Sequence, residues 1–179
     1  MPHADRPYKV TIVARGSTGG HTRYLPEEDR KLWTRNQFES VLAAALGGRV
    51  AEEVVFEEMT TGASNDLEQA TNVARTMVTR YGMSEKLGPR TFGKREELVF
   101  LGKELHEQRD YSDRVAEQID EEVHGLIDRA YVTAQGLLKS HGSTLKRVAE
   151  YLIANETVQG DDLQELLKGP DVPQAAPAG

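Results

Sequence analysis

The chain has 179 residues, enough for one medium-sized domain that buries about 70% of the surface of its unfolded chain. Hydrophobic residues make up 38%, charged residues 28% and aromatic residues only 6%, a composition typical of a globular and mainly helical protein. The net charge of −7 disfavours binding to nucleic-acid phosphates, and the lack of cysteine excludes disulfides, thiolate zinc ligands and cysteine nucleophiles.

Two short strands are predicted near the N-terminus. Residues 8–13 are rich in β-branched side chains, which favour a strand. A glycine-rich loop over residues 16–20 follows, and residues 21–25 can return beside the first strand. This pattern predicts a small N-terminal β-hairpin.

The first predicted helix starts after Thr34, which has capping-box spacing to Gln37. Apolar residues follow at helical intervals: Phe38, Val41, Leu42, Ala45 and Leu46. Gly47 and Gly48 then weaken a helix by about 1 kcal/mol each relative to alanine. Either the helix ends at this pair, or the pair lets a neighbouring segment pack close to the helix backbone. The sequence leaves both alternatives open.

The second predicted helix covers residues 65–81, and Gly82 ends it. Its apolar face consists of Leu67, Ala70, Val73, Ala74, Met77, Val78 and Tyr81. Residues 83–102 are predicted to be irregular, with residues 99–101 as a short extended piece.

The C-terminal third is predicted to be a bundle of antiparallel helices. Ser112 is a favourable N-cap for a long helix that His141 and Gly142 end, and shorter helices follow over residues 145–153 and 163–167. Pro, Ala and Gly dominate from Gly169 onward, which is typical of a disordered tail. We therefore divide the chain into a core (residues 1–110), a helical bundle (111–168) and a tail (169–179).

No segment predicts a membrane crossing. The longest purely apolar run, residues 41–46, is far shorter than the roughly 18 residues that span a bilayer. Residues 1–7 lack the apolar stretch of a signal peptide. We therefore expect this chain to be soluble and cytoplasmic, with any membrane anchor outside it.

A near-match to a P-loop lies at Gly88, Gly93 and Lys94. Arg95 stands where magnesium binding requires serine or threonine, and no apolar strand precedes the motif. We therefore do not interpret this segment as a nucleotide site.

A near-match to the HExxH zinc motif ends in aspartate, with His106, Glu107 and Asp110. Its surroundings are highly charged, which favours a solvated surface. None of the five histidines forms an i,i+4 pair, so the sequence carries no complete two-histidine helical zinc site.

Asp66 lies in the first turn of the second predicted helix. On general grounds an aspartate there interacts with the helix dipole or caps free backbone amides. That interpretation needs no ligand.

The segments around Asp66 nevertheless resemble a known family. TTGASNDLEQAT over residues 60–71 and MVTRYGMSEKLGP over residues 77–89 are similar to the signature of FtsH-type zinc metalloproteases. KVTI over 9–12, LPEED over 25–29 and LGGRVAEE over 46–53 are similar to further family motifs, in the same order. The resemblance covers residues 8–167.

The resemblance implies a mainly α fold, an FtsH-like metallopeptidase domain with a small β-hairpin and a C-terminal helical bundle. It implies a membrane-anchored, ATP-driven protease of unfolded or membrane proteins, assembled as a homo-hexamer at the cytoplasmic face of the bacterial inner membrane. Zinc is the implied cofactor, and ATP binds in an AAA+ module that this chain lacks. By position in the motif, Asp66 becomes the expected third zinc ligand and Glu52 an expected second-shell group.

The sequence contains no HExxH motif, so residues 1–110 represent a partial zinc peptidase core. Asp66 is then one of three family ligands, and no catalytic or cofactor-binding residue beyond it is expected in this chain. Even if His21 approached Asp66, two ligands would make a weak site. We expect the isolated chain to be inactive. The alternative function is a non-catalytic helical oligomerisation or interaction module.

Overall fold

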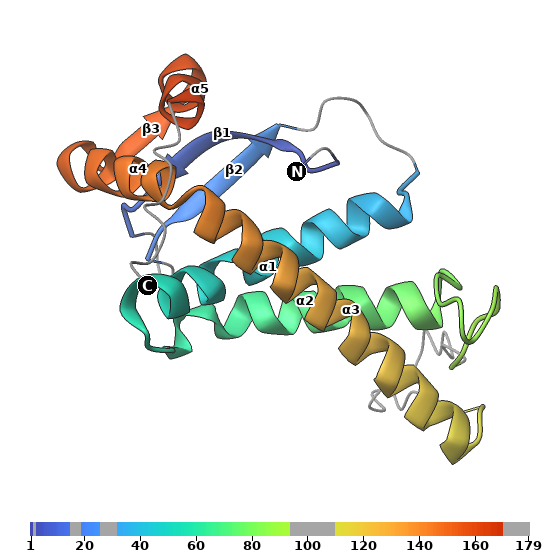
Figure 1. Ribbon diagram of the computed structural model, residues 1–179. Coiled ribbons are helices and arrows are strands. Elements are labelled where there is room, and N and C mark those ends of the chain that lie inside the picture. Colours follow the sequence, from blue (N-terminus) through green and yellow to red (C-terminus); the bar gives the residue numbers. More distant parts are fainter. Residues whose placement is uncertain (2, 15–18, 26–31, 94–109, 170–179) are drawn as a thin grey trace, which may run out of the picture.

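The computed structural model describes residues 1, 3–14, 19–25, 32–93 and 110–169. The mainly α prediction is confirmed (Figure 1). The strands are β1 (Arg6–Thr11), β2 (His21–Leu25) and β3 (Thr157–Gln159). The helices are α1 (Arg35–Phe56), the 3₁₀ helix η1 (Thr61–Ala63), α2 (Ser64–Thr79), α3 (Asp113–Ser140), α4 (Gly142–Asn155) and α5 (Gly160–Lys168).

The predicted capping box begins α1. The Thr34 hydroxyl accepts a hydrogen bond from the amide of Gln37 at 3.3 Å, and the Gln37 side chain accepts from the amide of Thr34 at 2.8 Å. Ser112 precedes α3 as predicted, although its side chain makes no capping hydrogen bond. A local capping box therefore fixes the start of α1, whereas α3 starts at the predicted position without a side-chain cap.

The main core lies between α1, α2 and α3. Figure 1 shows these three helices side by side. Each helix buries one apolar stripe against the other two. Leu42, Leu46 and Met77 are at most 2% exposed, and Ile119 is 1% exposed. A fully buried side chain of this size stabilises the fold by about 1.5–3 kcal/mol.

The sheet has three strands rather than the two of the predicted hairpin. The strand order is β2-β1-β3, and both pairings are antiparallel. β3 pairs Val158 with Val10, and the hydroxyls of Thr11 and Thr157 lie 2.7 Å apart. Three residues are too few to show strand alternation, so β3 could not be recognised locally.

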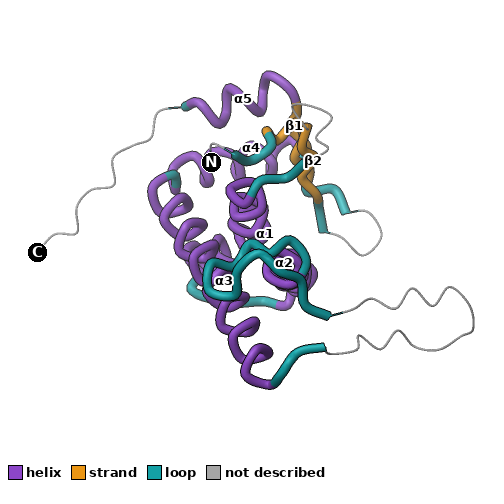
Figure 2. Tube along the Cα trace, turned by 90° about the vertical axis from the view of Figure 1, so that its right-hand side faces the viewer, coloured by secondary structure: helices purple, strands orange, loops and turns teal. Residues whose placement is uncertain are grey.

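The last two helices pack beside this sheet. Leu152 of α4, Val158 of β3 and Leu163 of α5 form a second apolar cluster with Val10 of β1. The Gln164 side chain donates to the carbonyl of Pro7 at 3.0 Å. Figure 2 shows α4 and α5 on the sheet side of the molecule and α3 beside α1 and α2. The C-terminal segments therefore close the fold against its N-terminal strand.

The division near residue 110 remains a prediction. Across it, α3 packs on α1 and α2, and the Tyr131 hydroxyl donates to the Glu53 carboxylate. Residues 99–101 and the tail beyond Gly169 lie outside the described residues. None of the described helices has both the length and the apolar character needed to cross a membrane.

Candidate metal centre

Helix α1 continues through Gly47 and Gly48, so the helix does not end at the glycine pair. The two glycines differ in their surroundings. A methyl group added at Gly47 would meet open space, whereas one at Gly48 would lie 3.8 Å from Oδ2 of Asp66. Of the two alternatives for the glycine pair, the structure therefore supports a close neighbour. That neighbour is the Asp66 side chain, which lies opposite Gly48.

Asp66 is held at the start of α2. The 3₁₀ helix η1 runs directly into α2, and the amide of Ser64 donates to the carbonyl of Thr61. Asp66 is the acidic residue of the first turn of α2, as the sequence predicts. Its position suits the helix dipole, and its carboxylate also faces α1.

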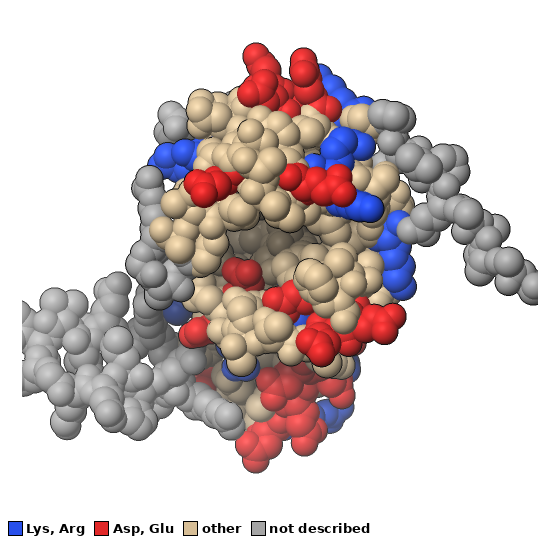
Figure 3. Space-filling view, turned by 90° about the vertical axis from the view of Figure 1, so that its left-hand side faces the viewer, with Lys and Arg blue, Asp and Glu red and all other residues tan. Residues whose placement is uncertain are grey.

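A cavity of about 670 Å³ opens beside this carboxylate. It is bounded by β1 and β2 on one side and by α1 and the start of α2 on the other. Figure 3 shows a hollow on the side of the molecule where α1 ends and α2 begins, with acidic side chains near its edge. The lining residues with ligand-forming side chains are Asp5, His21 and Asp66. The structure therefore brings His21 and Asp66 to one cavity.

Tyr24 of β2 lines the same cavity, and the charge of Asp66 affects its pKa. Partial burial raises the pKa of Tyr24 above its ordinary value, and the negative charge of Asp66 raises this pKa further. The carboxylate and the phenol thus face a common space from α2 and β2. Sequence reasoning missed Tyr24, because only the pairing of β2 with β1 brings this strand to the cavity.

Glu52 lies on α1, one turn beyond Gly48, and its carboxylate holds the loop before α2. Its Oε2 accepts the backbone amide of Thr60 at 3.0 Å, and its Oε1 accepts the Thr60 hydroxyl at 2.8 Å. The hydrogen bond from the Thr60 amide, then that from the hydroxyl, lowers the pKa of Glu52. These contacts are to the loop that carries Asp66, and the expected second-shell role of Glu52 remains a prediction.

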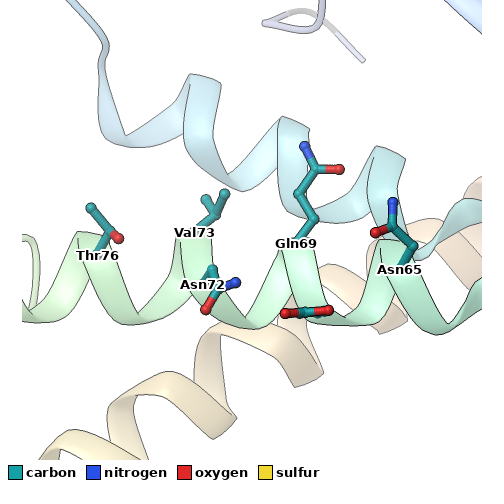
Figure 4. Close-up of a pocket in the computed structure, with 6 residues that line it drawn as sticks. Asn65, Gln69, Asn72, Val73 and Thr76 are labelled. Carbon is teal, nitrogen blue, oxygen red and sulfur yellow. The ribbon is translucent and has the colours of Figure 1, made fainter. Parts of the chain in front are cut away.

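A second open hollow, of about 460 Å³, runs along α2. Figure 4 shows Asn65, Gln69, Asn72, Val73 and Thr76 along this helix. Gln69 also lines the Asp66 cavity, so the two hollows share this residue. The three amide side chains can each donate and accept hydrogen bonds.

The fit of this site to a metal is partial. Carboxylate and imidazole are both zinc ligands, and Asp66 and His21 provide one of each around a cavity of sufficient size. Among the described residues, no group of three His, Asp or Glu side chains is close enough to hold a metal ion. The described residues can thus contribute to a zinc site, with the remaining ligands coming from elsewhere.

Neither of the two weaker sequence motifs lies wholly within the described residues. The glycines of the P-loop-like segment follow the helix α2 rather than a strand, and Lys94 and His106 lie outside the described residues. Asp110 accepts the amide of Gly93 at 2.8 Å. His124 is exposed on α3 and lies 3.2 Å from Asp128.

Residues 1–166 match the family model of peptidase family M41. The chain is 56% identical to ATP-dependent zinc metalloprotease FtsH 1 of Thermomicrobium roseum over 170 residues, which are 95% of this chain and 26% of that protein. It is 56% identical to FtsH of Chloroflexus aggregans over 171 residues, covering 94% and 26%, and 48% identical to FtsH 3 of Synechocystis over 172 residues, covering 93% and 28%. The chain therefore spans about a quarter of the length of these curated relatives.

Proposed function

The chain belongs to peptidase family M41, and from this membership we propose that it forms part of the proteolytic domain of an ATP-dependent zinc metalloendopeptidase. Its own contribution to the chemistry is one zinc ligand, Asp66. The observation that carries this proposal is the carboxylate of Asp66, which faces Gly48 and the 670 Å³ cavity from the first turn of α2.

When bound, zinc supplies a Lewis acid that activates water and polarises a peptide carbonyl. Asp66 would hold the ion, and Tyr24 would border the space in which the reacting carbonyl lies. Glu52 would act on Asp66 only through the loop that it holds at Thr60. Because the described residues contain no three-ligand cluster, the other ligands and the general base belong to parts outside them.

The substrates that we propose are unfolded or membrane polypeptides. The hollow along α2 supports this class, because its amide side chains match the donors and acceptors of a peptide backbone. It shares the lining residue Gln69 with the Asp66 cavity. An ATP-binding module outside this chain is proposed because the named relatives are ATP-dependent. A homo-hexamer and a membrane anchor at the cytoplasmic face of a bacterial inner membrane complete the proposal and rest on the family resemblance of the sequence motifs alone.

The alternative is a non-catalytic oligomerisation or interaction module. Exposed apolar side chains at the end of α1 favour contact with another protein, because Phe56 is 70% and Met59 62% exposed. This surface is compatible with either function, and the test below separates the two.

The test uses a chimera in which this chain replaces the aligned quarter of the Thermomicrobium roseum protein. We expect the chimera to degrade an unfolded protein and the Asp66→Ala variant to lose this activity. Asp162→Ala, which removes a first-turn carboxylate from another helix, α5, is the matched control and should remain active. An Asp66→Ala chimera that folds and degrades substrate at the control rate would contradict the proposed role.

A further inference from the structure

We propose that Thr60 is a positioning residue for the metal site, and that it fixes Asp66 by joining the start of η1 to Glu52 of α1. The inference rests on the proposed function, since it assigns Thr60 a role only if Asp66 binds metal. The Thr60 side chain does not line the cavity. It influences the position of Asp66 only through the backbone between the two residues.

Thr60 makes three hydrogen bonds at this point. Its amide donates to one oxygen of Glu52 at 3.0 Å, and its hydroxyl donates to the other oxygen at 2.8 Å. The same hydroxyl accepts the amide of Gly62 at 3.1 Å, which begins the 3₁₀ turn. A carboxylate that accepts two hydrogen bonds from one residue fixes that residue in orientation as well as in distance. We call the contacts among these three residues the Thr60 clamp.

The Thr60 clamp is coupled to Asp66 by a short and well-packed path. Ala63, the last residue of η1, is only 4% exposed, and α2 starts at Ser64 without a side-chain cap. Since no capping side chain at Ala63 sets the first turn of α2, the clamp and the burial of Ala63 determine where that turn lies. Asp66 is in this turn, so a shift of η1 moves its carboxylate relative to Gly48.

The clamp has no spare space on the side of the turn. A methyl group at Gly62 would lie 3.1 Å from the Thr60 hydroxyl and 3.5 Å from Oε1 of Glu52. The first distance is shorter than an ordinary contact, so a larger residue at position 62 must displace the hydroxyl. Gly62 is therefore part of the Thr60 clamp, and Gly62→Ala is a second substitution that should disturb the clamp.

The charge state of Glu52 gives an independent signature. Hydrogen bonds from Thr60 lower the pKa of Glu52, so the clamp favours folding with Glu52 ionised. A group whose pKa is lowered by folding contributes stability above its unfolded pKa and loses it as pH falls through the folded value. The stability difference between the natural chain and Thr60→Val should therefore be full at neutral pH and shrink in acid.

The test compares zinc affinity in the chimera. Thr60→Val keeps the shape of the side chain and removes the hydroxyl, and we expect zinc binding to weaken by about 10- to 100-fold, as for other outer-shell partners of metal ligands. Thr60→Ser retains the hydroxyl and should bind zinc as the unchanged chimera does. Thr71→Val is the matched control, because the Thr71 hydroxyl donates only to the Leu67 carbonyl within α2.

The outcomes separate this inference from the proposed function. Zinc affinity that is unchanged in Thr60→Val but lost in Asp66→Ala would overturn the inference alone. Unchanged affinity in both variants would overturn the proposed function as well. If Thr60→Val does not fold, Gly62→Ala and Glu52→Gln take its place, with the same expected weakening.

The 179-residue chain itself allows a further test. We expect the backbone amides of residues 60–63 to exchange hydrogen faster in Thr60→Val than in Thr71→Val. Equal exchange in the two variants would also overturn the clamp. A difference in stability between Thr60→Val and the natural chain that persists unchanged into acid would do the same.

Discussion

The charge of Asp66 acts at Tyr24, on the opposite side of the cavity. Partial burial is the larger cause of the raised pKa of Tyr24, and the Asp66 carboxylate is the second. The two residues come from α2 and β2 and are 42 positions apart in the printed sequence, by the difference of their numbers. A pKa measurement on Tyr24 therefore reports the geometry of the candidate site without any metal.

Asp66→Asn should lower the pKa of Tyr24 partway towards the ordinary tyrosine value. The sign follows because a nearby negative charge disfavours the tyrosinate, and removing it leaves only the effect of burial. The measurement is the ultraviolet absorbance of tyrosinate during a pH titration, assigned by the signal lost in Tyr24→Phe.

Glu53→Gln is the matched control for that titration. A hydrogen bond to Glu53 raises the pKa of Tyr131, so this substitution should shift Tyr131 and leave Tyr24 unchanged. A Tyr24 titration that does not respond to Asp66→Asn would show that the carboxylate does not face the cavity.

At the scale of elements, the starts of α1 and α3 could be predicted, whereas α4 and α5 each begin three residues earlier than predicted. Tertiary neighbours could not be predicted. The capping box of Thr34 and Gln37 is a local pattern, and α1 begins where it indicates. The strand β3 pairs with β1 over a separation of about 150 residues, and three residues carry too little pattern to reveal it. The Thr60 clamp was missed for the same reason, because its partner Glu52 lies on another element.

Gly47 and Gly48 give the element-scale prediction, because one helix offers two matched positions. Replacing either glycine by alanine should raise the free energy of unfolding of the isolated chain by about 0.5–1 kcal/mol, since both lie inside α1. In the chimera only Gly48→Ala should change zinc affinity, because its methyl group would come into van der Waals contact with Oδ2 of Asp66 at 3.8 Å. Chemical denaturation and zinc titration together check this prediction.

The result for Gly47→Ala sets the baseline. Its methyl group would meet open space, so a change in zinc affinity there would reflect the helix and not the site. Equal effects of the two substitutions on zinc would contradict the assignment of Gly48 as the residue opposite the carboxylate.

At the scale of the whole molecule, the fold places the candidate site between the helical core and the N-terminal strands. The helices α1, α2 and α3 share one core, and β3 and α5 close the sheet from the C-terminal end. The cavity lies between these two parts, with Asp66 from one and Tyr24 from the other. Family motifs in the sequence indicated Asp66 and zinc, whereas the opposing residues became visible only in the folded chain.

The number of zinc ligands in the described residues predicts how the isolated chain binds zinc and whether it hydrolyses peptides. Tight zinc sites use three or four protein ligands of fixed geometry, and the described residues provide no such group. We expect the 179-residue chain to hydrolyse no peptides and to bind zinc weakly. Submicromolar zinc binding that disappears in Asp66→Ala would show that this chain alone completes the site.

The zinc content of the purified chimera tests the role of Asp66 most directly. After dialysis against metal-free buffer, we expect about one zinc per chain in the unchanged chimera and in Glu68→Gln, as a single catalytic site requires. Asp66→Asn, which preserves the size of the side chain but removes its charge, should retain little zinc while keeping the same circular dichroism spectrum. A folded Asp66→Asn chimera with the full zinc content of the control would contradict the assignment of Asp66 as a ligand.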